Sequence, residues 1–120
     1  MRSGWLMFGF YLLPGLADAQ EKKTGQASKA EYEGWRQYMV HCARCHGDDA
    51  VAGVMAPDLR HSVRRGAASG STFDQVVTAG RPGKGMPGFE KTLKPDLVAA
   101  IRAYVTARAH GKLAAGRPAN

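Results

Sequence analysis

Apolar residues recur at helical spacing in three parts of the chain, and no segment alternates between apolar and polar positions as a half-buried strand would. The first part begins at Ser28, where the order Ser-Lys-Ala-Glu matches a capping box. Four residues then follow at three- and four-residue steps and share one helix face: Tyr32, Trp35, Met39 and Cys42. The pattern therefore predicts a helix that starts at Ser28 and runs into a pair of cysteines.

Two more helices are predicted after a long irregular stretch at 47–70, which is rich in Gly, Ala and Ser. Residues 72–75 form a second capping-box candidate and open a short helix that Gly80 ends. Residues 81–88 hold three glycines and two prolines and must form a loop. The last helix has Pro95 at its first position and ends at Gly111, with an apolar stripe of Leu97, Val98, Ile101, Tyr104 and Val105. We expect an all-α fold whose loops wrap around something other than protein.

The first 19 residues have the pattern of a secretory signal peptide. Arg2 is followed by an apolar run at 5–13, a Pro-Gly break and a small-x-small cleavage site at 17–19. The run is shorter than the roughly 20 residues that span a bilayer, which disfavours an uncleaved anchor. We therefore expect export to the bacterial periplasm, with no stable membrane insertion after cleavage before Gln20.

Cleavage would remove 19 of the 120 residues and leave 101, enough for one domain with a modest core. We expect a flexible segment at 20–27, the domain at 28–110 and a frayed tail at 111–120. The formal net charge of +7 indicates steering towards an acidic partner surface. The positive residues are scattered and form no nucleic-acid-binding motif, so no nucleic acid is expected as a partner.

The segment Cys42-Ala43-Arg44-Cys45-His46 is the attachment signature of a c-type haem. Each thiol can add across one vinyl group of the porphyrin, and His46 can ligate the iron from the proximal side. Because bacteria attach this haem after export, the signal peptide and the motif support each other. One haem c, bound through two thioethers, is therefore the predicted cofactor.

Other uses of these residue types are less well supported. A thioredoxin-like pair expects a βαβ setting, and a disulfide across two residues would constrain the unfolded chain little. With only two cysteines, a zinc site would need His46 plus His61 or His110. As iron ligands, His41 would point away from the haem, His61 lies among arginines on a solvated face, and His110 suits the negative end of the last helix.

The second axial ligand is predicted from the three methionines that follow the signal peptide. Met39 shares a helix with the motif and Met55 follows His46 by only nine residues, so neither reaches the opposite face easily. Met86 lies among two glycines and a proline, in a stiff loop that can approach the porphyrin closely. We predict that His46 and Met86 ligate the iron, a pair that raises the reduction potential.

These residues resemble the class I c-type cytochromes, a family of small soluble monohaem electron carriers. The resemblance covers about 28–110 and implies the cytochrome c fold, with three to five helices around one covalently bound haem. In this family a glycine and an aromatic residue, eight and four positions before the first cysteine, contact the last helix. Gly34 and Tyr38 occupy those positions, and Ile101 with Tyr104 resemble their partners.

The resemblance also implies residues around the haem. A family proline accepts a hydrogen bond from the proximal imidazole through its carbonyl, and Pro57 in the segment Ala-Pro-Asp-Leu stands in its place. Pro57 would thus orient His46. Leu59 and Phe89 would form part of the haem wall.

The segment 80–89 is also similar to a loop of cytochromes that accompany periplasmic quinoprotein alcohol dehydrogenases. We therefore expect a monomeric one-electron carrier between a donor of that class and an acceptor such as a terminal oxidase, and no enzymatic activity. Arg81 and Lys84, beside Met86, are expected near the docking edge for acidic redox proteins. The alternatives are a fixed haem subunit of a dehydrogenase complex, and a haem enzyme or gas sensor with a displaceable distal ligand.

Overall fold

The structure is a computed structural model, and it describes residues 25–51, 53 and 55–120. The signal peptide expected at 1–19 and residues 20–24 lie outside the described residues. Within the described part the chain forms helices and no strand, so the all-α prediction is confirmed. None of the helices described there has the length and apolarity that crossing a membrane requires.

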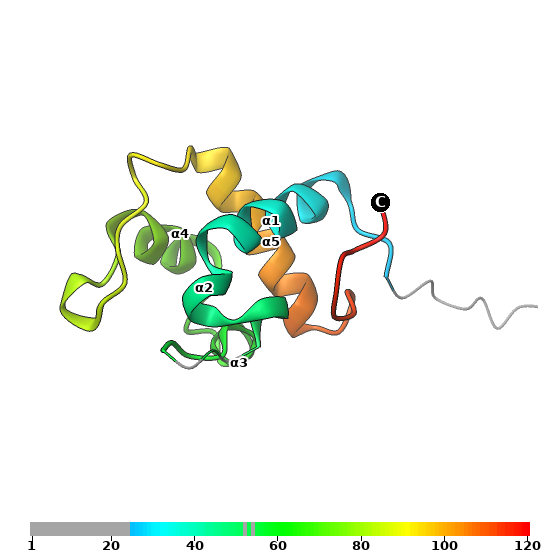
Figure 1. Cartoon of the computed structure of the whole chain (residues 1–120), viewed down its shortest axis with the longest axis horizontal. Coiled ribbons are helices and arrows are strands. Elements are labelled where there is room, and N and C mark those ends of the chain that lie inside the picture. Colours follow the sequence, from blue (N-terminus) through cyan, green and yellow to red (C-terminus); the bar gives the residue numbers. More distant parts are fainter. Residues whose placement is uncertain (1–24, 52, 54) are drawn as a thin grey trace, which may run out of the picture.

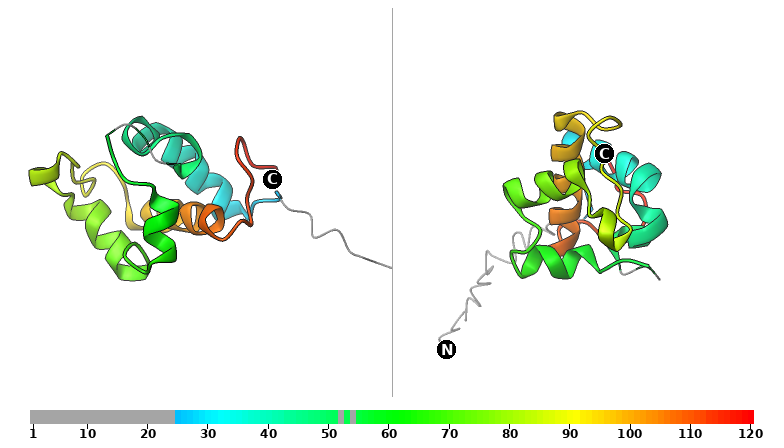
Figure 2. Two further views of the ribbon diagram at one scale, coloured as in Figure 1. Left: turned by 90° about the horizontal axis from the view of Figure 1, so that it is seen from below. Right: turned by 90° about the vertical axis from the view of Figure 1, so that its left-hand side faces the viewer.

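The described residues form five α-helices and two short 3₁₀ helices. In chain order they are α1 (Lys29–His41), α2 (Ala43–His46), η1 (Asp48–Ala50), α3 (Leu59–Arg64), α4 (Gly70–Ala79), η2 (Pro82–Lys84) and α5 (Pro95–Ala109). Helix α5 contacts α1, α3 and α4 (Figure 1). Figure 2 shows α1 and α2 on one side of the molecule and α3 with α4 on the other.

Helix α1 begins with the predicted capping box. The hydroxyl of Ser28 accepts a hydrogen bond from the backbone N–H of Glu31 at 3.1 Å, and the carboxylate of Glu31 accepts one from the N–H of Ser28 at 2.8 Å. These bonds satisfy two of the backbone donors that a helix start leaves without partners. The capping box fixes where α1 starts and therefore where its last turn delivers the cysteines.

Helices α1 and α5 cross in close contact through the residue pairs that the resemblance implies. A Cβ atom on Gly34 would overlap the carbonyl oxygen of Ala100, so the two backbones touch directly. The rings of Tyr38 and Tyr104, both fully buried, lie 5.2 Å apart between centroids and are tilted at 54°. Ile101 is only 1% exposed. This crossing forms the centre of the core.

The stretch at 47–70 is more ordered than the sequence predicts. It contains η1 and α3, and α3 starts at Asp58, whose carboxylate accepts hydrogen bonds from the backbone N–H groups of Arg60 and His61. Helix α4 begins at Gly70 with Ser69 as its N-cap, three residues before the predicted cap at Thr72, and makes no side-chain cap bond. Its predicted end is confirmed, since Gly80 adopts a φ of +71°.

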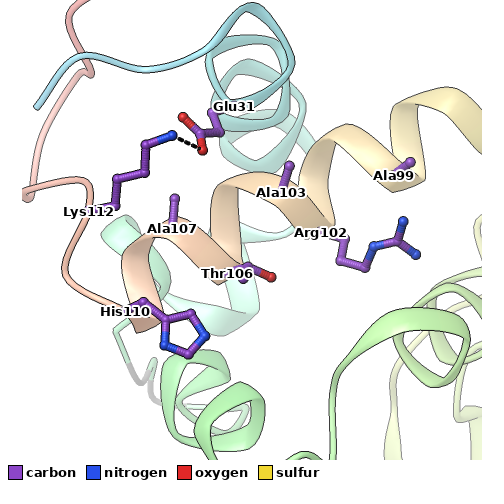
Figure 3. Close-up of a pocket in the computed structure, with 8 residues that line it drawn as sticks. All are labelled: Glu31, Ala99, Arg102, Ala103, Thr106, Ala107, His110 and Lys112. Carbon is purple, nitrogen blue, oxygen red and sulfur yellow. Dashed lines mark hydrogen bonds and ion pairs between the residues drawn. The ribbon is translucent and has the colours of Figure 1, made fainter.

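The tail at 111–120 is packed onto the domain, so the prediction of a frayed tail is wrong. Leu113 is 1% exposed, and Ala119 accepts a hydrogen bond from the N–H of Ala27 at 2.7 Å. The ammonium of Lys112 lies 2.6 Å from the Glu31 carboxylate (Figure 3). Burial raises the pKa of Glu31, but its bonds to Lys112 and Ser28 outweigh this and hold the pKa below its ordinary value.

The α1–α5 crossing predicts the effect of Gly34→Ala on stability. Helix propensity alone would favour alanine by about 1 kcal/mol. The overlap with a backbone carbonyl that cannot rotate away should reverse the sign and cost about 1–3 kcal/mol. Chemical denaturation of both proteins measures the difference.

Gly83→Ala is the matched control, because a Cβ there meets nothing within 4 Å. Its free energy of unfolding should stay within about 0.5 kcal/mol of the wild type. A Gly34→Ala variant at least as stable as the wild type would contradict the close crossing.

Candidate haem-binding site

The cysteine motif occupies the junction of α1 and α2. The N–H of Cys42 still donates to Tyr38 at 2.8 Å, and the N–H of His46 donates to Cys42 at 2.9 Å. One further turn ends at Gly47, which has a φ of +80°. The tight winding of this segment brings both cysteines and His46 within a single helical turn.

The two thiols are free, which excludes the disulfide reading for this structure. Burial, reinforced by the neighbouring Cys45, raises the pKa of the Cys42 thiol to about 12, so Cys42 stays protonated at neutral pH. No group of three or more His, Cys, Asp and Glu side chains that could hold a metal ion occurs among the described residues. The zinc reading thus finds no support in this part of the chain, and the absence of a described strand leaves no βαβ setting either.

The ring of His46 is held by Pro57. Its Nδ1 atom lies 3.0 Å from the Pro57 carbonyl oxygen. Because a carbonyl oxygen only accepts, Nδ1 carries the proton and Nε2 keeps a free lone pair. An imidazole in this tautomer can donate that lone pair to iron, and its bond to the carbonyl increases the basicity of the ligand.

The position of Pro57 depends on the start of α3. Asp58 caps that helix and also forms an ion pair with Arg60 at 2.9 Å. The pKa of Asp58 is lowered to about 2, mainly by the guanidinium of Arg60 and further by backbone N–H groups. Burial acts in the opposite direction but is outweighed. The carboxylate therefore stays charged, and α3 begins at a fixed point directly after the carbonyl that His46 uses.

The loop that carries Met86 is anchored on both sides. Arg81 and Met86 exchange backbone hydrogen bonds of 2.8 and 3.1 Å, which close the loop. The N–H of Phe89 donates to Val77 of α4 at 3.0 Å, and Gly88 leaves no room for a Cβ against the α4 backbone. Gly88 thus permits a close approach of the loop to α4.

The three methionines among the described residues differ in exposure. Met55 is 80% exposed and Met39 is 39% exposed. Met86 is half-buried and packs against the core. Four of the predicted site residues pack against this same cluster: Cys42, Leu59, Met86 and Phe89. Of the competing histidines, His41 contacts the ring of Phe89, a predicted haem-wall residue, edge-on, and His61 and His110 are exposed.

Tyr38 has a second role that the sequence reasoning missed. Its hydroxyl donates to the Gly47 carbonyl at 2.6 Å, directly after the motif. Burial raises the pKa of Tyr38 well above its ordinary value, so the hydroxyl keeps the proton that it donates. Most buried tyrosine hydroxyls find a hydrogen-bond partner, and this tendency was the available signal.

A surface hollow of about 410 Å³ lies elsewhere on α5 (Figure 3). It is lined by Ala99, Arg102, Thr106, Lys112 and neighbouring residues, and by none of the predicted site residues. It is therefore separate from the candidate haem-binding site.

The donor set fits a haem c. It offers two free thiols two residues apart, an imidazole with a free Nε2, and a half-buried thioether in an anchored loop. Helices packed around such a set define the class of c-type cytochromes.

Comparison with known proteins gives the family. Residues 29–105 match the family described as "Cytochrome C oxidase, cbb3-type, subunit III". The chain therefore belongs to this family of cytochrome c domains, and the family cofactor is covalently bound haem c. The family name refers to an oxidase subunit, whereas the match shows only that residues 29–105 form a cytochrome c domain of this family.

The relatives include dehydrogenases and small cytochromes. The chain is 36% identical to quinohemoprotein alcohol dehydrogenase ADH IIB of Pseudomonas putida, over 79% of this chain and 14% of that protein. It is 35% identical to cytochrome c-553I of Paracoccus denitrificans, over 81% of this chain and 45% of that protein. The chain spans only 10% to 16% of the length of the alcohol dehydrogenases that it matches.

A solved structure supports the cytochrome c fold. The c-type cytochrome XoxG from Methylobacterium extorquens AM1 superimposes with a TM-score of 0.70 at 27% identity. The superposition covers 80% of this chain and 60% of that one. The fold expected from the resemblance is therefore confirmed.

The Asp58 cap predicts a dependence of stability on pH. The folded pKa of about 2 lies below the ordinary value of 3.8, so the folded state binds fewer protons between these values. The contribution of Asp58 is fully present above about pH 4 and is lost as the pH falls towards 2. At neutral pH, Asp58→Ala should lower the free energy of unfolding by about 1 kcal/mol.

Asp58→Asn is the matched control, since asparagine also caps helices but carries no charge. Unfolding midpoints measured from pH 7 downwards should show the wild type and Asp58→Asn converging as Asp58 becomes protonated. A constant gap between the two across that range would contradict the role of the carboxylate charge.

Proposed function

We propose that this protein is a periplasmic one-electron carrier that moves electrons from a dehydrogenase to a downstream acceptor such as a terminal oxidase. The observation that carries the proposal is the His46 ring, bound through Nδ1 to Pro57 beside two free thiols. Haem iron supplies the chemistry by alternating between Fe(III) and Fe(II). Family membership and relatives that include small cytochromes support the same reading.

Each predicted site residue has a distinct role in this proposal. Cys42 and Cys45 would attach the porphyrin, and His46 and Met86 would supply the iron with a nitrogen and a sulfur ligand. Pro57 orients the imidazole, and Leu59 and Phe89 exclude water from the haem wall. With both an imidazole and a thioether bound to it, the iron would have no open position for a small substrate, which disfavours the enzyme and gas-sensor alternatives.

A dehydrogenase donor is supported by the relatives. Five of them are alcohol dehydrogenases, in which the matched region is a small part of a much longer protein. A domain of this kind can therefore be linked covalently to its donor in those proteins. In this chain the same electron transfer would occur in a transient complex with a separate dehydrogenase. The second candidate function is that of a haem subunit bound stably to such a dehydrogenase. Copurification with a large enzyme at high salt distinguishes the second from the first.

The charge of the protein suits a monomer that meets acidic redox proteins. Arg81 and Lys84 are exposed in the loop that carries Met86, so they would lie at the docking edge. Contacts between redox partners are small and short-lived, and long-range attraction then determines how often productive encounters occur.

Purification from a host that matures c-type cytochromes tests the proposal. The product should be coloured, with both thiols alkylated by the porphyrin, and the reduced protein should bind carbon monoxide slowly. Met86→Ala should lose the methionine–iron charge-transfer band and bind carbon monoxide rapidly, because one axial position opens.

Met55→Ala is the matched control and should behave as the wild type, since Met55 is 80% exposed. A colourless product would contradict the proposal as a whole. Rapid carbon monoxide binding by the wild type would instead favour a gas sensor or enzyme, and a normal band in Met86→Ala would transfer the ligand role to another residue.

The docking edge predicts how charge reversal affects electron transfer. In the double variant Arg81→Glu/Lys84→Glu, oxidation by the trianion hexacyanoferrate(III) should slow about tenfold at low ionic strength. The difference should nearly vanish at about 1 M salt, where the screening length is about 3 Å. Stopped-flow mixing of the reduced protein with the oxidant measures both rates.

The control is Lys29→Glu/Arg65→Glu, which makes the same change in net charge at exposed positions on α1 and at the end of α3. It should slow the reaction much less. Equal slowing in both double variants would show that net charge alone matters and that the Met86 loop is not the docking edge.

A further inference from the structure

The turn directly after His46 places Ala50 in a backbone conformation that alanine does not favour. Asp49 and Ala50 have φ values of +61° and +59°, in the left-handed region. Asparagine, aspartate and glycine tolerate this region, whereas alanine rarely adopts it. Ala50 is also fully buried. Such a turn persists only when contacts with the rest of the molecule hold it.

The main contact comes from Arg108, close to the C-terminal end of α5. Its Nε donates to the Asp49 carbonyl at 2.9 Å, and its Nη1 donates to the Leu113 carbonyl at 2.7 Å. The side chain is buried, with the residue 9% exposed. The guanidinium fork suits this position because its several donors can reach two carbonyls from separate segments at once.

The tail adds a second contact to the same turn. The N–H of Gly116 donates to the side-chain carboxylate of Asp49 at 2.7 Å. The tail in turn is fixed to α1, beside which it runs in Figures 1 and 2. The guanidinium of Arg117 lies over the rings of Tyr32 and Trp35, 5.8 and 5.9 Å from their centroids, and donates to the Tyr32 hydroxyl at 2.6 Å.

We propose that Arg108 and the tail segment 112–119 form a strap that positions the turn after His46, with Arg108 as the positioning residue. The proposal rests on the proposed function, because it matters for electron transfer only if His46 ligates iron. The strap holds the backbone at Asp49, three residues after His46, and the Pro57 carbonyl holds the His46 ring. Loss of the strap would let the turn relax towards negative φ and would loosen the backbone to which the imidazole is attached.

Arg108→Met in the haem-loaded protein tests the proposal. Methionine keeps an unbranched apolar stem but leaves both carbonyls without their donor. Amide hydrogen exchange at residues 48–51 and exchange of the His46 Nδ1 proton should each accelerate by about tenfold. The reduction potential should fall, since water admitted near the site favours the oxidised charge.

Two variants separate positioning from general stability. Arg102→Met removes an arginine from the same helix that is paired with Asp74, so it controls for the loss of a guanidinium contact. It should leave exchange at 48–51 and at His46 unchanged. Arg108→Lys keeps the charge without the fork and should give an intermediate effect. Equal acceleration in Arg102→Met and Arg108→Met would overturn the proposal.

Relief of the backbone conformation gives an independent test. In Ala50→Gly the positive φ costs little and both strap contacts to Asp49 are kept, so the turn should need the strap less. Adding Arg108→Met to Ala50→Gly should therefore accelerate exchange at residues 49 and 51 much less than Arg108→Met does alone. An undiminished effect would show that Arg108 does not act through this turn.

The failure of the strap and the failure of the proposed function give different results. A wild-type protein without covalently bound haem contradicts the proposed function, whatever Arg108 does. A normal coloured protein in which Arg108→Met leaves the exchange rates and the potential unchanged contradicts the strap alone. Deletion of residues 114–120, which removes Gly116 and Arg117 but keeps Leu113, should accelerate the same protons if the strap exists.

Discussion

The close crossing of α1 over α5 is the contact on which the rest of the structure depends. Gly34 allows the α1 backbone to rest on the carbonyl of Ala100, because any side chain there would overlap that oxygen. The crossing places Tyr38 against Tyr104 and lets the Tyr38 hydroxyl reach the Gly47 carbonyl. The capping box sets the start of α1, and the crossing sets its distance from α5. Together they determine where the cysteines and His46 lie.

The ring of His46, the proposed iron ligand, and the segment around it are restrained by contacts from several elements. The Pro57 carbonyl selects the tautomer of His46, and the helix cap at Asp58 determines where that carbonyl lies. On the backbone side, Arg108 reaches Asp49 from α5. Rigid surroundings of this kind suit an electron carrier, whose geometry must change little between oxidation states.

Sequence reasoning missed features whose partners are distant along the chain. Helix α3 has only six residues, too few for a periodic pattern, although the order Pro57-Asp58 was a helix-start signal. The tail appeared frayed because its partners, such as Glu31 and Ala27, lie some 80 or more residues earlier. Arg108 continues the apolar stripe of α5, three positions after Val105, and a charge there could have been recognised as a buried one.

The sequence by itself determined the features that local chemistry controls. The spacing of Cys42, Cys45 and His46 specifies the cofactor, the capping box specifies the start of α1, and Gly80 specifies the end of α4. Only the tertiary structure decided that a charged side chain is buried at Arg108, that the tail is ordered, and that the turn after His46 has a left-handed conformation. The physical reason is that these features are unfavourable locally. They become stable only when hydrogen bonds from distant segments offset the cost of burial and backbone strain.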